Sequence, residues 1–281
     1  MTVHVIIPVH NRMALTKSLV ACLRAQILNE TLHMLIVNDG STDGTAEWLS
    51  AQGDIDVLDA DGSLFWGGAV DLALCHLEPR AMPEDWVLLM NNDTTIAASF
   101  IQHLLDVAKA NAPAAVGSVI RDEADHACLL SIGAHVDAWR IFVTDLLTKE
   151  MRAPPTERVF EVDVLSGRGV IFPIASLVAA GGMRPRVLPH YLADYELSVR
   201  VRKRGWRLLI DTGAAVFSNR EYGNLKQMSS WWDKMFSVRS PKYLPAFLAF
   251  WWAASNWPQR LTMPVRLPLL FLLPRLRKPT A

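Results

Sequence analysis

The sequence predicts an α/β fold in which a mostly parallel central sheet is flanked by helices. Short apolar segments typical of buried strands alternate with segments whose apolar residues recur at helical spacing, through the first half of the 281-residue chain. Apolar residues make up 51% of the chain, which is enough for the core of a large domain. Such alternation builds βαβ units, and their right-handed crossovers bring the strand-end loops to one edge of the sheet.

The first 110 residues divide into strands and helices in turn. The β-branched segment 3–9 is the first strand, and Leu15, Leu19 and Leu23 mark the helix that follows it. A loop rich in turn-forming residues, 38–45, follows the second strand. The expected strands are 3–9, 33–37, 56–58 and 86–90, and the expected helices are 13–25, 45–51, 67–77 and 99–110.

Between residues 114 and 172 the pattern is less regular, and we interpret it as a mixed-sheet extension of the same domain, which continues to residue 228. Short strands are expected at 115–120, 141–144, 159–165 and 206–211. Helices are expected at 175–180 and 195–204, each followed by glycine. Residues 1–228 are therefore predicted to form a single domain.

The segment 229–281 differs in character from the rest of the chain. It contains five tryptophans, and from residue 220 onward ten Lys and Arg stand against two acids, although the whole chain has no net charge. Its apolar stretches, 246–254 and 267–273, are too short to cross a bilayer. Tryptophan-rich basic segments suit the membrane interface, so we predict a helical tail that binds there peripherally. The alternative is two helices packed on the domain with a solvated basic end.

Three carboxylates stand where predicted strands end or a helix begins. Asp39 follows an apolar run, and it either accepts a hydrogen bond from the imide N–H of uracil or thymine or forms a turn with its own backbone. Asp93 follows the strand 86–90 and suits a ligand for Mg²⁺ or Mn²⁺; the alternative is a helix N-cap, although the next helix starts several residues later. Asp194 lies at a helix start, either as an N-cap or as a general base for a hydroxyl nucleophile.

Weaker signals surround these carboxylates. Gly67 and Gly68 open a helix and would let a phosphate approach backbone N–H groups. Arg168 stands between two glycines after a strand, where it either faces a phosphate or a sugar or is simply solvated. His190 and Asp194 are near enough in sequence to form a pair. The sequence has no P-loop, zinc-protease pattern, nucleophile elbow or kinase motif.

Taken in order, these segments resemble a family 2 glycosyltransferase with the GT-A fold. The matching segments are Ile6–Arg12, Val37–Thr45, Asn91–Asp93, Leu165–Gly169 and Ala193–Leu197, with Arg200, Gly205 and Trp206. The V-N-D-G-S-T-D-G-T segment at 37–45 is highly specific, and the others are specific mainly in combination. Within the family the chain is most similar to bacterial rhamnosyltransferase-like members.

The resemblance implies roles for the matching residues. Asp39 contacts the base, Asp93 holds a divalent cation (Mg²⁺ or Mn²⁺), and Asp194 deprotonates the acceptor hydroxyl. We assign to the nucleotide pocket Pro8, His10, Asn11, Arg12, Asp39, Gly67, Gly68 and Asn92. Arg168 and His190 are expected at the sugar or the diphosphate. Because the family inverts the anomeric centre in one displacement, one base and one metal suffice.

The chain departs from the family at three places. Asn91 replaces the first acid of the D-x-D motif, which leaves one carboxylate for the metal. Ala193 replaces the glutamate of the E-D pair, so Glu196 is assigned to share the catalytic duty. Members often have a metal-ligating histidine after the last strand, but this chain has Val216–Asn219, and His190 or the asparagine of that segment would substitute.

The sequence therefore predicts an inverting, metal-dependent glycosyltransferase. It would move a sugar from a nucleotide-diphospho-sugar to a hydroxyl of a glycan or lipid-linked acceptor in bacterial cell-surface polysaccharide synthesis, with rhamnosyl transfer as one candidate reaction. We expect it in the cytoplasm, peripheral on the inner face of the cell membrane, because the chain enters its first strand without a signal-peptide pattern. The zero net charge argues against a nucleic-acid partner.

Two rival functions fit parts of the pattern. A nucleotidyltransferase would need a basic, glycine-rich loop after the first strand, which residues 10–13 do not provide. A noncatalytic nucleotide-sugar-binding or scaffold protein is favoured by the loss of family acids at Asn91 and Ala193.

Overall fold

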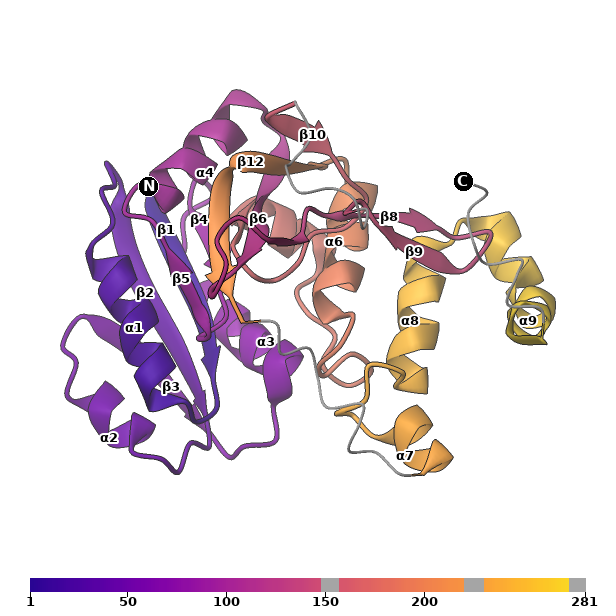
Figure 1. The fold of residues 1–281 in the computed structure, drawn as a ribbon, viewed down its shortest axis with the longest axis horizontal. Coiled ribbons are helices and arrows are strands. Elements are labelled where there is room, and N and C mark those ends of the chain that lie inside the picture. The colour runs from indigo at the N-terminus through magenta and orange to yellow at the C-terminus, as the bar shows by residue number, and fades with distance from the viewer. Residues whose placement is uncertain (148–156, 220–229, 273–281) are drawn as a thin grey trace.

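A computed structural model describes residues 1–147, 157–219 and 230–272, and Figure 1 shows them arranged around one large twisted sheet. The sheet has ten strands in the order β10-β12-β6-β11-β4-β1-β2-β3, with β5 paired to β12 and β7 paired to β6, while β8 and β9 form a separate hairpin. The strands are β1 (Thr2–Val9), β2 (Thr31–Asp39), β3 (Ile55–Ala60), β4 (Trp86–Leu89), β5 (Thr94–Ile96), β6 (Ala114–Asp122), β7 (Leu129–Ser131), β8 (Ala134–Asp137), β9 (Phe142–Asp145), β10 (Val159–Glu161), β11 (Val170–Pro173) and β12 (Arg207–Ser218). The helices are α1 (Met13–Arg24), α2 (Thr45–Ser50), α3 (Phe65–Leu77), α4 (Phe100–Ala110), α5 (Ile174–Ala180), α6 (Ala193–Lys203), α7 (Trp231–Phe236), α8 (Leu244–Ala254) and α9 (Trp257–Leu272).

The strands β1 to β4 form the parallel half that the sequence predicts. β1 pairs in parallel with β2 and β4, and β2 pairs in parallel with β3. These strands are apolar on both faces because helices cover both. Leu19 of α1 and Leu104 of α4 belong to the core on one face, whereas Val70 of α3, Leu177 of α5 and Leu197 of α6 belong to the core on the other. The prediction of a mostly parallel sheet flanked by helices is confirmed.

β11 is a strand that the sequence did not predict, and it places a functional loop. It lies between β4 and β6 and is antiparallel to both. With four residues directly after a glycine-rich loop, it shows no usable alternation. Because β11 runs opposite to β4, the loop that precedes it reaches the edge where β4 ends, and Gly169 N donates to Leu89 O at 2.9 Å.

The C-terminal helices are partly built into the domain. α8 lies against α6, where Phe250 and Trp251 are buried in a cluster with Val164 and Val199. A hydrophobic cluster of this kind ties the predicted tail to the sheet domain through α8, so the extension is helical as predicted but is not a free appendage. The predicted boundary at 228/229 falls outside the residues that the structure describes.

α9 is longer than the sequence suggested. It is one helix of 16 residues that continues through Pro264 and Pro268, where a short segment at 267–273 was expected. Within the described residues, no helix is long and apolar enough to span a bilayer. Part of the basic character assigned to the tail lies outside the described residues, at Arg220, Lys226, Arg275, Arg277 and Lys278.

Candidate active site

The loops after β1 and β2 interlock at the carboxyl edge of the sheet. His10 Nδ1 lies 2.5 Å from the carbonyl oxygen of Asp39. Asn11 N donates to Ser41 Oγ at 2.8 Å, and Thr42 N donates to Asn11 Oδ1 at 2.8 Å. Three residues assigned to the nucleotide pocket, His10, Asn11 and Asp39, are thereby brought together, as expected for strand-end loops of neighbouring parallel strands.

The carboxylate of Asp39 organises the segment ahead of α3. Oδ1 accepts hydrogen bonds from Gly62 N at 2.9 Å and Leu64 N at 3.3 Å, and Oδ2 accepts one from Phe65 N at 3.0 Å. The side chain is buried, so these bonds satisfy a charge that would otherwise be costly to bury. Contact between Asp39 and a base stays a prediction, and it would use a remaining lone pair.

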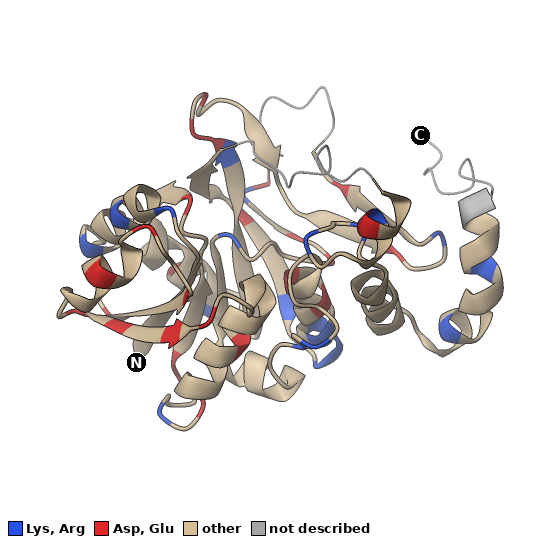
Figure 2. Ribbon diagram, turned by 90° about the horizontal axis from the view of Figure 1, so that it is seen from below, with Lys and Arg blue, Asp and Glu red and all other residues tan. Residues whose placement is uncertain are grey.

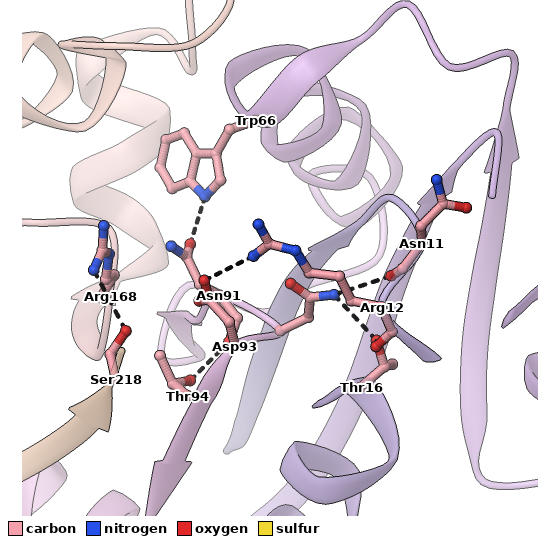
Figure 3. Close-up of polar contacts among 10 residues, drawn as sticks. Asn11, Arg12, Thr16, Trp66, Asn91, Asp93, Thr94, Arg168 and Ser218 are labelled. Carbon is pink, nitrogen blue, oxygen red and sulfur yellow. Dashed lines mark hydrogen bonds and ion pairs between the residues drawn. The ribbon is translucent and has the colours of Figure 1, made fainter. Parts of the chain in front are cut away.

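Asp93, the predicted metal ligand, forms an ion pair with Arg12 (Figure 3). Arg12 Nη1 donates to Asp93 Oδ2 at 2.9 Å. The other carboxylate oxygen, Oδ1, is buried and has no hydrogen-bond partner among the described residues. Arg12 and Asn11 before it both have left-handed backbones, with φ of 64° and 59°. Such strain in residues other than glycine persists where surrounding contacts fix it, and here it aims the guanidinium at the carboxylate.

Trp66 joins the two sides of the site, although sequence reasoning did not single it out. Its Nε1–H donates to Asn91 Oδ1 at 2.8 Å (Figure 3). Its ring lies so close to Gly167 that a Cβ there would be 2.3 Å from Trp66 Cζ2. The preceding residue, Phe65, has φ of 55° and is held by Asp39. The one signal in the sequence was an aromatic pair directly ahead of two glycines.

Gly67 and Gly68 permit close packing inside the protein. Gly67 N donates to Pro189 O at 2.7 Å, and a Cβ on Gly67 would be 2.5 Å from Leu188 O. A Cβ on Gly68 would be 3.2 Å from Leu64 Cβ. The Gly67 amide is thus engaged by the 188–189 loop, and the phosphate contact assigned to this glycine pair is a prediction that this packing does not favour.

Asn92 and Pro8 support the edge from behind. Asn92 is buried, and its Nδ2 donates to Thr16 Oγ1 at 3.1 Å and to Asn11 O at 3.4 Å. Pro8 lies in β1 opposite Val37 of β2, one residue before the strand ends. Both positions fix the backbone of the first loop, and their contact with a nucleotide stays a prediction.

Asp194 has the environment expected of a general base. It lies in the first turn of α6, where its Oδ2 accepts from Gly167 N at 2.9 Å and its Oδ1 accepts from Tyr195 N at 2.9 Å. Burial raises the pKa of Asp194 above its ordinary value, and the hydrogen bonds and the nearby charge of Arg168 offset this only in part. A carboxylate with a raised pKa binds a proton more strongly than an ordinary aspartate does.

Glu196, assigned to share that duty, is held in a buried ion pair instead. Arg200 Nε donates to both of its oxygens, at 2.8 and 2.9 Å, and Arg184 Nη1 lies 3.1 Å from Oε1. Asp194 and Glu196 have different partners because side chains two residues apart on a helix point in different directions. The geometry therefore favours Asp194 over Glu196 as the base.

Arg168 and His190 are the two residues expected at the sugar or the diphosphate. Arg168 Nη1 lies 3.5 Å from Ser218 Oγ, across the space from Asn91 and Asp93 in Figure 3. The His190 ring packs near Phe65 and Tyr191, with centroids 6.2 and 4.4 Å apart. Burial, with a smaller effect of Arg239, lowers the pKa of His190, so the ring is neutral near pH 7.

The three carboxylates are joined by contacts through the segment 65–66. Asp39 accepts a hydrogen bond from Phe65 N. The Trp66 side chain contacts Asn91, two residues before Asp93, and also packs against Gly167. Gly167 N in turn donates to Asp194. Two cavities, of about 120 and 380 Å³, lie elsewhere, beside α3 and the 183–187 loop, and none of the predicted site residues lines them. The candidate site is therefore an edge of the sheet shaped by linked loops.

The residues present fit a divalent cation that takes one ligand from the protein, Asp93, and shares its other ligands with the donor and water. The buried, unpartnered Oδ1 of Asp93 is a suitable hard oxygen donor. Asn91 Oδ1 already accepts a hydrogen bond from Trp66. Asn219, which with His190 was a predicted substitute for the family histidine, is exposed directly after β12. Within the described ranges no group of three His, Cys, Asp or Glu is arranged to hold a metal. A cation here would take its remaining ligands from the donor and from water.

The N-terminal part of the sequence is similar to a known family. Residues 4–127 match the family model described as glycosyl transferase family 2. The chain is similar to this family over that segment, which is less than half of its 281 residues. The match includes Asp39 and Asp93 and ends before Asp194. No protein with a curated description matches the chain significantly by sequence.

Solved GT-A glycosyltransferases share the fold of this chain. GalNAc-T7 with UDP, GalNAc and Mn²⁺ has a TM-score of 0.62 at 12% identity, over 78% of this chain and 44% of that one. S. aureus TarS 1-349 with UDP-GlcNAc has a TM-score of 0.54 at 17% identity, over 79% and 60%. The mannosyltransferase PcManGT from Pyrobaculum calidifontis, with GDP-Man and Mn²⁺, has a TM-score of 0.55 at 14% identity, over 96% and 80%. The chain thus spans about half the length of the first of these, and the likeness shows the fold alone.

Proposed function

We propose that this protein is an inverting glycosyltransferase that moves a sugar from a nucleotide-diphospho-sugar to a hydroxyl of a glycan or lipid-linked acceptor. One observation carries the proposal: Asp194, a carboxylate whose pKa is raised, lies beside Arg168 on the same sheet edge as Asp93. The UDP, UDP-GlcNAc and GDP-Man held by the solved neighbours support a nucleotide-sugar donor. Bacterial cell-surface polysaccharide synthesis, and rhamnose as the sugar, are proposed on sequence resemblance.

In this reaction the acceptor oxygen attacks the anomeric carbon while the bond from that carbon to the diphosphate breaks. Asp194 takes the hydroxyl proton. General-base catalysis of this kind typically raises the reaction rate by about 10²–10⁴-fold. Arg12 and Arg168 supply positive charge at the edge where the diphosphate leaves. A single displacement of the diphosphate by the acceptor oxygen, with Asp194 as the base, inverts the anomeric configuration.

A divalent cation would supply further neutralisation of the departing diphosphate. Asp93 is the residue that would hold it, through the oxygen not bound to Arg12. The diphosphate of the donor would provide the remaining charge, since Asn91 replaces the first acid of the D-x-D motif. This arrangement makes cation binding depend on the nucleotide.

The test is a panel of UDP-, dTDP- and GDP-sugars incubated with the protein and Mn²⁺ or Mg²⁺. We expect slow hydrolysis of at least one donor, measured as released nucleoside diphosphate, and its loss in the Asp194→Asn variant. Binding of a donor with no turnover under any acceptor would instead indicate a noncatalytic nucleotide-sugar-binding protein. The identity of the donor that is turned over also fixes the base and the sugar.

We also propose peripheral membrane contact through the outer faces of α7 and α9. On α9, Trp257, Leu261, Val265 and Leu269 recur at four-residue intervals and are all exposed, while Met263 on the opposite face is buried. A soluble helix would carry polar residues on that outer face. Trp231 and Trp232 on α7 are 61% and 64% exposed. Exposed apolar surface of this extent marks an interaction site.

The charges near these faces suit anionic lipid. Figure 2 shows basic residues and no acidic ones on α9; they are Arg260 and Arg266. Their guanidinium groups lie 5.0 Å from the Trp252 ring centroid and 4.9 Å from that of Trp139 in the β8–β9 turn. Aromatic rings paired with cations are typical of segments at headgroup depth.

Vesicle flotation of the full chain tests this contact. We expect flotation with anionic vesicles and much less with neutral ones, and we expect Trp231→Ala with Trp257→Ala to reduce it several-fold. Ile27→Ala, which removes an exposed apolar residue from the opposite part of the molecule, serves as the matched control. Equal flotation of all three proteins would contradict the proposal.

A further inference from the structure

We propose that Arg12 is a resident counter-ion of Asp93 that couples divalent-cation binding to nucleotide binding. It pairs with the carboxylate in the nucleotide-free protein and turns to the diphosphate when the donor binds. The inference rests on the proposed function, since it takes a nucleoside diphosphate as the ligand. The supporting geometry is the 2.9 Å contact from Arg12 Nη1 to Asp93 Oδ2, in a pair whose side chains are 52% and 23% exposed. The guanidinium therefore has a free side that faces solvent and can meet an anion.

The fold fixes the starting point of the Arg12 side chain. Thr16 N and Oγ1 both donate to Arg12 O, at 3.1 and 3.2 Å. The preceding Asn11 is tied to Ser41 Oγ at 2.8 Å and receives a bond from Asn92 at 3.4 Å. Two consecutive left-handed residues held on both sides are unlike a flexible surface loop. A chance surface ion pair needs no such support, and its usual contribution is small.

Electrostatics gives the coupling its sign. A divalent cation that approaches the free Oδ1 of Asp93 meets a carboxylate whose charge Arg12 already balances, and the two cations repel each other across a few ångströms. Asn91 Oδ1, which stands where the family has the first acid of its motif, already accepts a hydrogen bond from Trp66. A diphosphate placed among them attracts both cations and removes the repulsion. Cation and nucleotide must then strengthen each other's binding by the same factor.

The experiment measures Mn²⁺ binding by the full chain, from the electron paramagnetic resonance signal of free Mn²⁺, alone and with saturating UDP, dTDP or GDP. For the natural chain we expect weak binding of Mn²⁺ alone and much tighter binding with one of the three nucleotides. Arg12→Gln should strengthen the binding of Mn²⁺ alone by about tenfold and weaken the nucleotide, so that their mutual enhancement falls. Arg12→Lys, which keeps the charge, should leave the binding of Mn²⁺ alone weak.

Arg24→Gln is the matched control, because Arg24 also pairs with one aspartate, Asp54, at 2.6 Å on the surface away from the site. It should change neither affinity. Equal binding of Mn²⁺ alone by the natural chain and Arg12→Gln overturns the inference. If Arg12→Gln binds Mn²⁺ more tightly but no variant binds any of the three nucleotides, the counter-ion role stands and the proposed function fails.

Discussion

The proposed donor side and the proposed acceptor side of the candidate site place their carboxylates in opposite environments. On the donor side, at the ends of β2 and β4, Asp39 accepts three backbone hydrogen bonds and Asp93 is paired with Arg12. On the acceptor side Asp194 is half-buried next to the loop that precedes β11, where it accepts hydrogen bonds from two backbone donors, and desolvation raises its pKa. Carboxylates with matched partners position a ligand, whereas a carboxylate that is poorly solvated is ready to take a proton.

The largest expected effect is on the acceptor side. Asp194→Asn removes the base but retains an oxygen for Gly167 N, so we expect transfer to fall by about 10²–10⁴-fold while donor binding persists. Initial rates with a saturating donor, beside a direct measurement of nucleotide affinity, separate the two quantities. Glu196→Gln is the comparison on the same helix, and because Glu196 is held by Arg200 it should affect stability more than the chemical step. Equal rates for the natural chain and Asp194→Asn would refute the base assignment.

The next largest effect is expected on the donor side. Asp93→Asn removes the cation ligand and leaves Arg12 unpaired, and we expect kcat/KM to fall by about 10²-fold with a higher requirement for Mn²⁺. The measurement is a titration of activity with Mn²⁺ at a fixed donor concentration. Asp106→Asn, on the exposed face of α4, should leave activity unchanged. A variant at position 93 with normal activity and normal Mn²⁺ dependence would remove Asp93 from the mechanism.

The join between the two sides can be broken without touching a carboxylate. Gly167→Ala would place a Cβ 2.3 Å from the Trp66 ring, so the ring or the loop must move. We expect a loss in kcat of about tenfold, because small displacements of catalytic groups are costly. Gly53→Ala, where a Cβ would meet nothing within 4 Å, is the control. Activity close to normal in Gly167→Ala would show that the contact between Trp66 and Gly167 does not align the two sides.

The pH dependence of kcat should reflect the ionisation of Asp194. The base acts in its ionised form, and burial raises the pKa of Asp194 above the ordinary value of 3.8, so kcat should rise with pH through an inflection above that value. The measurement is kcat from pH 4 to 8 with a saturating donor. Nucleotide affinity, measured by calorimetry over the same range, should not follow this inflection. A profile that is flat down to pH 4 would contradict the environment described for Asp194.

Stability should change in opposite directions on the two sides, by the smallest amounts. Asp39→Ala leaves three backbone donors without their acceptor, and we expect a loss of about 1–3 kcal/mol in the free energy of unfolding. Burial raises the pKa of Asp194 in the folded protein above its ordinary value, so holding this carboxyl group in the fold costs free energy at neutral pH, and Asp194→Asn should gain about 0.5–2 kcal/mol. Urea unfolding at pH 7 gives both values. A loss of stability in both variants would show that the two carboxylates are equally structural.

Much of the fold and of the donor side could be predicted from local sequence. The strands and helices up to residue 110, except the short strand β5, follow from periodicity, and Asp39 and Asp93 were placed by the apolar strands before them. The predicted site residues on the acceptor side were harder to judge. Glu196 and Asp194 are two residues apart, and only the packing of α6 shows that one meets Arg200 and the other meets Gly167. The contact partners of Gly67 likewise come from the distant 188–189 loop.

The sequence by itself determined the alternation of strands and helices and the edge where the loops gather, because these depend on short-range patterns of apolar and polar residues. Only the tertiary structure decided that β11 inserts antiparallel beside β4, that Trp66 spans from Asn91 to Gly167, and that Arg12 rather than a second acid accompanies Asp93. Each of these is a contact between residues far apart in the chain, and such contacts are fixed by the packing of the whole sheet and its helices rather than by local preference.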